Sequence, residues 1–96
     1  METIDRKFKF LAINPCKGTI YTEKNAVLFL AKDAGLLPTL DRYLKFCENV
    51  GCDPSHIESV ELLMGRVRKF QQEYGSKQPD TETPCEIDRC IGGKLD

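Results

Sequence analysis

SHIESVELLMGRVRKFQQEY, residues 55–74, carries the most regular hydrophobic pattern in the chain. Its apolar side chains recur every three or four residues, as expected for one face of an α-helix with about 3.6 residues per turn. They are Ile57, Val60, Met64, Val67, Phe70 and Tyr74. The stretch therefore predicts a long amphipathic helix that packs along one side.

Signals for both ends of this helix flank the pattern. Asp53 can cap the helix with Pro54 as its first residue, or Ser55 can cap it with Glu58 completing a capping box. Gly75 follows the last apolar position and is expected to end the helix.

A second helix is predicted immediately upstream, over residues 36–50. Its apolar positions also step by three and four residues, and Pro38 is tolerated because it lies near the start. These positions are Leu37, Leu40, Leu44 and Cys47. The two helices are expected to form an antiparallel helical hairpin.

The junction between the helices, CENVGCDPSH at residues 47–56, contains two of the five cysteines and the only histidine. If Gly51 takes the left-handed conformation after the first helix, a Schellman motif forms. Cys47 and Cys52 then occupy the two positions whose side chains touch, and cysteine acts there as a small hydrophobe. We favour this structural interpretation of the two thiols.

Residues 6–22 predict a β-hairpin. Phe8 and Phe10 alternate with lysines, and the turn sequence NPCKG ends in Gly18, which can adopt positive φ. Two short strands are not stable alone in water, so the hairpin is expected to pack against the helices.

Residues 23–34 fit two structures. Residues 27–30 are apolar on every side, which suits either a central helix or a buried strand. Charged residues at both ends of the segment, with Gly35 just beyond it, favour a helix.

The polar residues 76–84 predict an exposed connector, and a capping box at residues 83–86 predicts a short C-terminal helix within residues 85–96. The predicted fold class is therefore α+β. An N-terminal β-hairpin packs against an antiparallel helical hairpin in a single domain over residues 1–75, followed by the connector and the short helix.

The composition argues against several classes of partner. The net charge of −1 comes from 14 basic and 15 acidic side chains mixed along the chain, whereas nucleic-acid binders concentrate cations on one face. No apolar run is long enough for a membrane span or a signal peptide. We expect a cytoplasmic chain whose thiols stay reduced, so its five cysteines do not predict a disulfide framework.

The sequence lacks a phosphate-binding glycine loop, a GxSxG elbow and an HExxH helix. It therefore predicts no enzyme and no cofactor. Zinc binding is the first alternative. Its candidate ligands are two C-x4-C pairs, Cys47 with Cys52 and Cys85 with Cys90, with His56 as a replacement for one of them. Zinc knuckles usually have about two to four residues between the cysteines, and both pairs are at the wide end of that range.

A thiol-dependent redox protein is a further alternative. Cys52 precedes a helix N-terminus, which would lower its pKa, and His56 could act as its base. The sequence shows no third group that would orient the imidazole ring.

Arg66, Arg68 and Lys69 form a cationic cluster on the outer side of the long helix. Such a cluster suits an acidic protein partner or, as another alternative, a small nucleotide-like anion held by a sponge protein. Gly65 lies beside the cluster and costs up to about 1 kcal/mol relative to alanine in an exposed helix. Close approach of another backbone would explain the glycine and predicts self-association.

The stretches INPCKGTIYTEKNAVLFLAKDAG, PTLDRYLKFC and HIESVELLMGRVRKFQQEYGSKQPD together resemble the small accessory proteins encoded by bacteriophages and prophages. The resemblance spans roughly residues 8–80 and implies a non-enzymatic protein in the bacterial cytoplasm. It implies a bacterial host protein as the partner, with inhibition of an antiviral defence system as one role. No functional residue is carried over from the resemblance.

Overall fold

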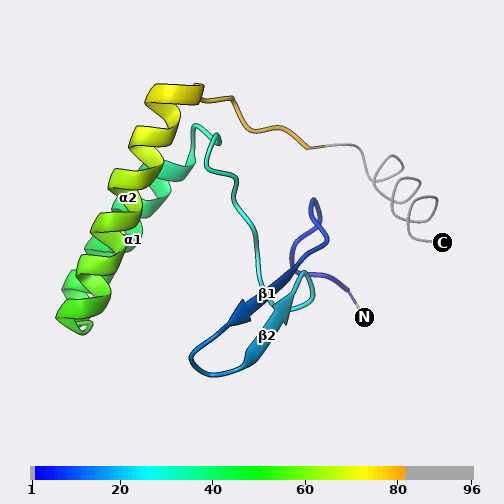
Figure 1. The fold of residues 1–96 in the computed structure, drawn as a ribbon, viewed down its shortest axis with the longest axis horizontal. Coiled ribbons are helices and arrows are strands. Elements are labelled where there is room, and N and C mark those ends of the chain that lie inside the picture. Colours follow the sequence, from blue (N-terminus) through cyan, green and yellow to red (C-terminus); the bar gives the residue numbers. More distant parts are fainter. Residues whose placement is uncertain (1, 82–96) are drawn as a thin grey trace. The chain divides into compact units, whose positions relative to one another are not determined.

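The computed structural model describes residues 2–81. Four elements follow one another along the chain: β1 (Leu11–Asn14), β2 (Thr19–Thr22), α1 (Leu36–Val50) and α2 (Pro54–Tyr74) (Figure 1). The α+β class predicted from the sequence is confirmed. The predicted C-terminal helix lies outside the described residues.

The chain divides into two compact units. The first contains the β-hairpin and, among the described residues, spans residues 2–28 with residues 80 and 81; the second, Phe29–Pro79, contains both helices. Each unit is described by itself below. The single domain over residues 1–75 stays a prediction.

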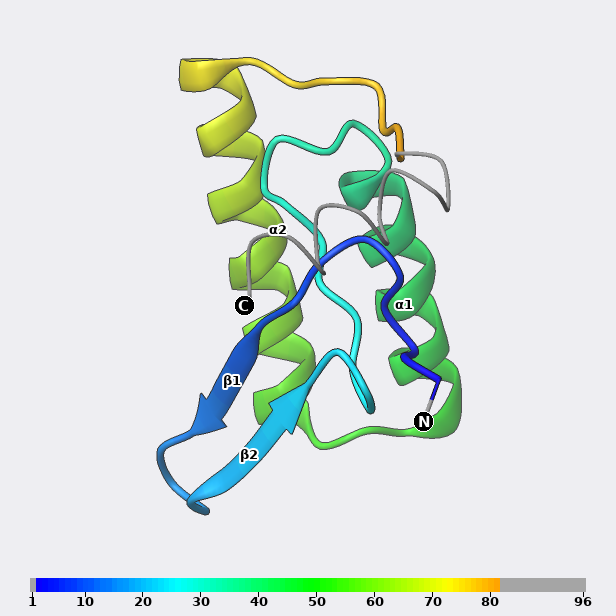
Figure 2. The same cartoon turned by 90° about the vertical axis from the view of Figure 1, so that its right-hand side faces the viewer.

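The β-hairpin has the predicted turn. β1 and β2 pair antiparallel, with Leu11 opposite Thr22 and Ile13 opposite Ile20 (Figure 2). Gly18 adopts a φ of 69° and donates its backbone N–H to the Asn14 carbonyl at 2.8 Å. The turn therefore uses glycine where an L side chain would be strained.

The first strand begins at Leu11, five residues later than the predicted hairpin. The backbone N–H groups of Lys7 and Phe8 both donate to Asp5 Oδ1 at 2.8 Å, and that of Phe10 donates to Glu23 Oε1 at 3.2 Å. Because these three N–H groups bind side-chain carboxylates, the N–H groups are not available for hydrogen bonds to a neighbouring strand.

Asp5 is the central polar group of this unit. It is only 8% exposed, and its Oδ2 accepts a 2.7 Å hydrogen bond from the backbone N–H of Leu28. Burial alone would raise the pKa of Asp5, but the backbone N–H groups of Phe8, Leu28 and Lys7 lower it below its ordinary value. The ionised carboxylate thus ties the start of the chain to residue 28.

The preference for a helix over residues 23–34 is wrong. Residues 26–30 have no regular secondary structure, and the segment ends in an isolated bridge between Asp33 and Lys77. Leu28 N–H is bound by Asp5, and Gln71 Nε2 donates to the carbonyls of Ala31 and Asp33 at 3.0 and 2.9 Å. These long-range bonds satisfy backbone groups that a local helix would have paired.

α2 begins as the first of the two predicted alternatives. Asp53 is the N-cap, Pro54 is the first helical residue, and Asp53 Oδ1 accepts from the backbone N–H of Ser55 at 2.9 Å. The helix ends at Tyr74, where Gly75 has a φ of 88° and donates to the Gln71 carbonyl.

The turn between α1 and α2 is a Schellman motif, as predicted. Gly51 has φ 74° and ψ 42°, and the backbone N–H of Cys52 donates to the Cys47 carbonyl at 2.9 Å. The Gly51 N–H donates to the Glu48 carbonyl at 3.3 Å. Both hydrogen bonds of the motif are therefore present.

α1 and α2 lie side by side with opposite directions (Figure 1). The side chains that pack between them are the buried apolar residues of the described chain: Leu36, Cys47, Val60, Met64 and Val67. Cys47 is the most buried of them, with 1% of its surface exposed. The seam between the helices is thus the core of this unit.

Replacing Asp5 by Asn tests the carboxylate tie. The Asn side chain keeps Oδ1, which accepts from the N–H groups of Lys7 and Phe8. Its NH₂ group takes the place of Oδ2 and cannot accept from the Leu28 N–H. Amide hydrogen exchange should show that protection of the Leu28 N–H falls by about 1.5–3 kcal/mol while the other two N–H groups change less. Equal loss at all three N–H groups would contradict the separate roles of the two oxygens.

The wild-type protein should also lose this tie in acid. The folded pKa of Asp5 lies below its unfolded value, so the contribution is present above pH about 4 and disappears as the pH falls through the folded pKa. Protection of the Leu28 N–H should fall over that interval. In Asp5→Asn the Leu28 protection should lack this acid transition, and an identical transition in both proteins would contradict the assignment.

Gly51 and Gly65 form a matched pair for glycine-to-alanine substitution. Gly51→Ala forces an L side chain into the left-handed region and should cost about 1–2 kcal/mol, which lowers Tm by roughly 4–8 °C per kcal/mol. In Gly65→Ala the added Cβ has no neighbouring atom within 4 Å beyond the backbone of α2 itself. The higher helix propensity of alanine should stabilise the fold by up to about 1 kcal/mol and so raise Tm. Thermal unfolding followed by circular dichroism measures both, and an unchanged Tm for Gly51→Ala would contradict the Schellman assignment.

Candidate functional site

α1 presents a row of exposed apolar side chains beside the seam. Tyr43, Phe46 and Val50 follow one another at spacings of three and four residues, which places them on one side of the helix. All three are exposed, and Phe46 exposes 58% of its surface. This row lies next to the buried Cys47 rather than facing α2.

α2 carries a matching row. His56, Leu63, Phe70 and Tyr74 are spaced by seven, seven and four residues and therefore share one side of the helix. The rings of Phe70 and Tyr74 contact each other with centroids 4.8 Å apart. Leu63, Phe70 and Tyr74 are all exposed.

A contact between the helices shows that both rows lie on the same side of the helical hairpin. Tyr43 Oη lies 3.0 Å from His56 Nε2, and the two rings meet edge to face with centroids 5.9 Å apart. Tyr43 belongs to the first row and His56 to the second, so the rows adjoin. We call the exposed apolar side chains of both rows the helical face: Tyr43, Phe46, Val50, Leu63, Phe70 and Tyr74.

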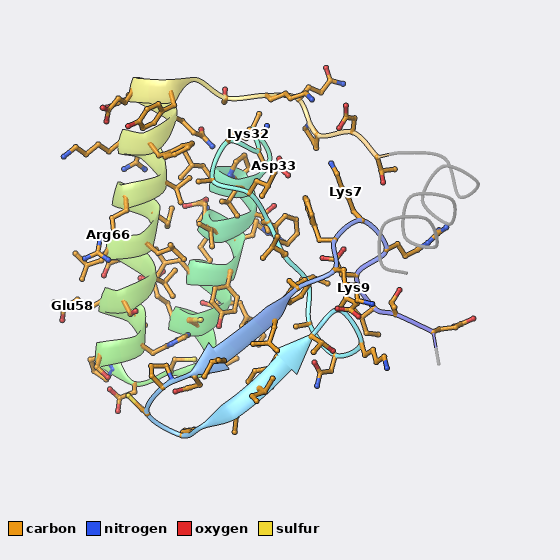
Figure 3. All side chains as sticks on the ribbon, turned by 45° about the vertical axis from the view of Figure 1, so that its right-hand side comes forward. Lys7, Lys9, Lys32, Asp33, Glu58 and Arg66 are labelled. Atoms are coloured by element: carbon orange, nitrogen blue, oxygen red, sulfur yellow. The ribbon has the colours of Figure 1, made fainter. Side chains whose placement is uncertain are left out.

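The predicted cationic cluster is not one patch: Arg68 and Lys69 lie away from the helical face, whereas Arg66 lies beside Leu63 and Phe70 at its edge. Gly65, Arg68 and Lys69 are spaced by three and four residues on one side of α2, and all are exposed. Arg66 precedes Arg68 by two residues, which turns it about 160° away around the helix axis. Figure 3 shows Arg66 projecting outward from α2, away from α1.

The opposite side of α1 is polar. Asp41 and Lys45 form an ion pair with 3.0 Å between Oδ2 and Nζ, and both are largely exposed. Such a pair contributes only a few tenths of a kcal/mol. The helical hairpin is therefore amphipathic as a layer, with its exposed apolar side chains concentrated on one side.

The two cysteines of the junction fit the Schellman interpretation better than a metal site. Cys47 is buried in the seam, and burial together with a hydrogen bond to the Cys47 thiol raises the pKa of Cys52. Within residues 2–81, no three His, Cys, Asp or Glu side chains are grouped so that they could hold a metal ion. Cys85 and Cys90 lie outside the described residues, so the zinc alternative that includes them stays a prediction.

The sequence-based expectation was a lowered pKa for Cys52, whereas burial, and after it the Cys47 thiol, raises the pKa of this thiol. His56 Nε2 contacts the Tyr43 hydroxyl, and hydrogen bonding to the Cys47 thiol is the largest cause that raises the pKa of Tyr43. Sequence reasoning missed this tyrosine. Its position four residues before Cys47 on the same helix was the available signal.

The β-hairpin has an apolar face of its own. Residues paired directly across two strands share a face, so Ile13 and Ile20 lie together with Leu11. These three side chains, the hairpin face, are exposed, with 60% of Ile13 and 57% of Ile20 accessible.

Exposed cations surround this hairpin. Between residues 6 and 24 the one carboxylate is Glu23, which is 9% exposed and binds the Phe10 N–H. The basic residues of the same stretch are all exposed: Arg6, Lys7, Lys9, Lys17 and Lys24. Lys7 lies 3.4 Å from the Asp80 carboxylate, and Figure 3 shows Lys7 and Lys9 on the segment before β1. The exposed side-chain charges of residues 6–24 are therefore cationic.

No protein-family model, curated protein or solved structure matches this chain. In the part of the chain that the structure describes, neither helix combines the length and the apolar character that crossing a membrane requires.

The thiol environments predict an order of alkylation. Cys16 is exposed in the hairpin turn and should react with iodoacetamide first, Cys52 should follow, and Cys47 should react last. At a given pH, Cys52 should react more slowly than an exposed cysteine of ordinary pKa, since its raised pKa leaves less thiolate. Peptide mapping by mass spectrometry gives the three rates, and a Cys52 that reacts faster than Cys16 at pH 7 would restore the nucleophile hypothesis.

Proposed function

We propose that this protein is a non-enzymatic binding protein that modulates a bacterial host protein by direct contact. The observation that carries the proposal is the β-hairpin, which combines an exposed apolar face with exposed cations. Monomeric proteins seldom leave apolar side chains grouped on a regular element unless the group serves an interaction. The resemblance to bacteriophage accessory proteins supports a host partner, with a component of an antiviral defence system as one such partner.

The chemistry of the hairpin favours an acidic protein surface. Leu11, Ile13 and Ile20 offer aliphatic contacts, and the lysines around them complement carboxylates at the rim of the partner. Proteins that bind single-stranded nucleic acid rely instead on aromatic side chains that stack on the bases. The hairpin face is aliphatic, which favours protein over nucleic acid.

Photocrosslinking in the bacterial cytoplasm tests this function. A photoreactive amino acid replaces Ile20 on the hairpin face or, as the matched control, Lys45 on the polar side of α1. We expect Ile20 to capture one defined acidic protein that Lys45 does not capture. Capture of nucleic acid, or no difference between the two positions, would contradict the proposal.

Reconstitution with the captured protein then tests the contact. Lys17→Glu should weaken binding to the purified partner by about ten-fold or more, and high salt should weaken wild-type binding as well. Lys45→Glu applies the same charge change to the polar side of α1 and should leave affinity unchanged. Isothermal titration calorimetry measures these affinities, and equal effects of both substitutions would show that net charge rather than the hairpin determines binding.

A further inference from the structure

The helical face is a row of six apolar side chains that the helical unit leaves exposed. Its six side chains have exposed fractions from 37% at Phe70 to 70% at Tyr74. At about 150–250 Å² per aromatic side chain, these fractions correspond to an exposed area on the order of 600 Å². That area lies at the upper limit of what monomeric proteins leave exposed.

The architecture of the unit explains why this face needs a cover. Two antiparallel helices share one seam, and here the seam buries only a few apolar side chains. Stable domains consist of at least two packed layers, and a pair of helical hairpins forms a four-helix bundle when one hairpin covers the other. A second layer would bury the aromatic side chains that stand beside the seam.

The chemistry of the face indicates which partner forms this layer. At helical spacing, the other positions between members of the two rows are Cys47, Ser59, Val60, Arg66 and Val67, so Arg66 is the one charged side chain among them. Homodimer interfaces are more apolar than transient ones, and a twofold interface requires a patch that is complementary to itself. The six side chains meet that requirement as an apolar centre, and Arg66 lies in the polar rim that surrounds such a centre.

We propose that the helical face binds the helical face of a second copy of this chain, which gives a twofold dimer with a four-helix core. Two such faces bury about 1,200 Å² in total, which reaches the size of a stable protein interface. The inference goes beyond the proposed function, since it concerns the helical unit and needs no host protein. The sequence predicts self-association from Gly65. In the proposed dimer the contact lies on the side of α2 that carries Phe70, not on the side of Gly65.

Sedimentation velocity of the purified full-length chain tests the dimer. The wild-type protein should sediment as a dimer over a range of about 1 to 100 µM, with a micromolar or tighter Kd. Phe46→Glu places a charge in the helical face and should weaken the dimer at least about ten-fold. Leu62→Glu is the matched control, because Leu62 is an exposed apolar residue of α2 that lies outside the face, and it should leave the dimer unchanged.

Three results would overturn the inference: a monomeric wild type at about 100 µM, a Phe46→Glu variant that dimerises as tightly as wild type, or equal loss in both variants. If Phe46→Glu fails to fold by circular dichroism, a photoreactive phenylalanine analogue at position 46 provides a second test. In a mixture of isotopically light and heavy chains, cross-links between the two isotopic forms support the dimer. Cross-links confined to single chains would show that the same chain covers the face and would overturn it.

Discussion

The left-handed turn at Gly51 sets how the two helices meet. It reverses the chain within three residues and places the Cys47 side chain at the end of the seam, where the Cys52 thiol packs against it. Asp53 then caps α2 at once, so the second helix starts in a fixed register. That register brings Tyr43 against His56 and aligns the exposed apolar rows of both helices on one side. The helical face is thus a consequence of the turn.

Elements determined by local chemistry were predictable from the sequence. Four features depend on residues close in the chain: the spacing of apolar residues in the helices, the start of α2 at Asp53 and Pro54, the left-handed Gly51, and the turn that ends at Gly18. The later start of β1 depends on Asp5, which binds the N–H groups of Lys7 and Phe8 nearby, and on Glu23, which lies 13 residues from Phe10. The absence of a helix before Gly35 depends on Asp5 and Gln71, which lie 23 to 40 residues from the backbone groups that they bind. Apolar periodicity contains no information about which distant carboxylate or amide takes a backbone group.

The candidate surfaces were only partly predictable. The sequence shows that Arg66, Arg68 and Lys69 are cationic, but the helix turns Arg66 away from the other two. It also shows balanced charge over the whole chain, whereas residues 6–24 hold five cations and one carboxylate, that of the buried Glu23. Charge balance along a sequence therefore does not describe charge balance on a surface. In this chain the difference comes from five cations clustered in residues 6–24, where the one carboxylate is buried.

In our two proposals, the hairpin binds a host protein and the helical face binds a second copy of this chain. Isotope-filtered nuclear Overhauser spectroscopy on an equal mixture of labelled and unlabelled full-length chains tests the central claim most directly. The account predicts contacts between copies that involve the rings of Phe46, Phe70 and Tyr74, while Tyr43 keeps its contact with His56 within one chain. Ring contacts found only within single chains would contradict it.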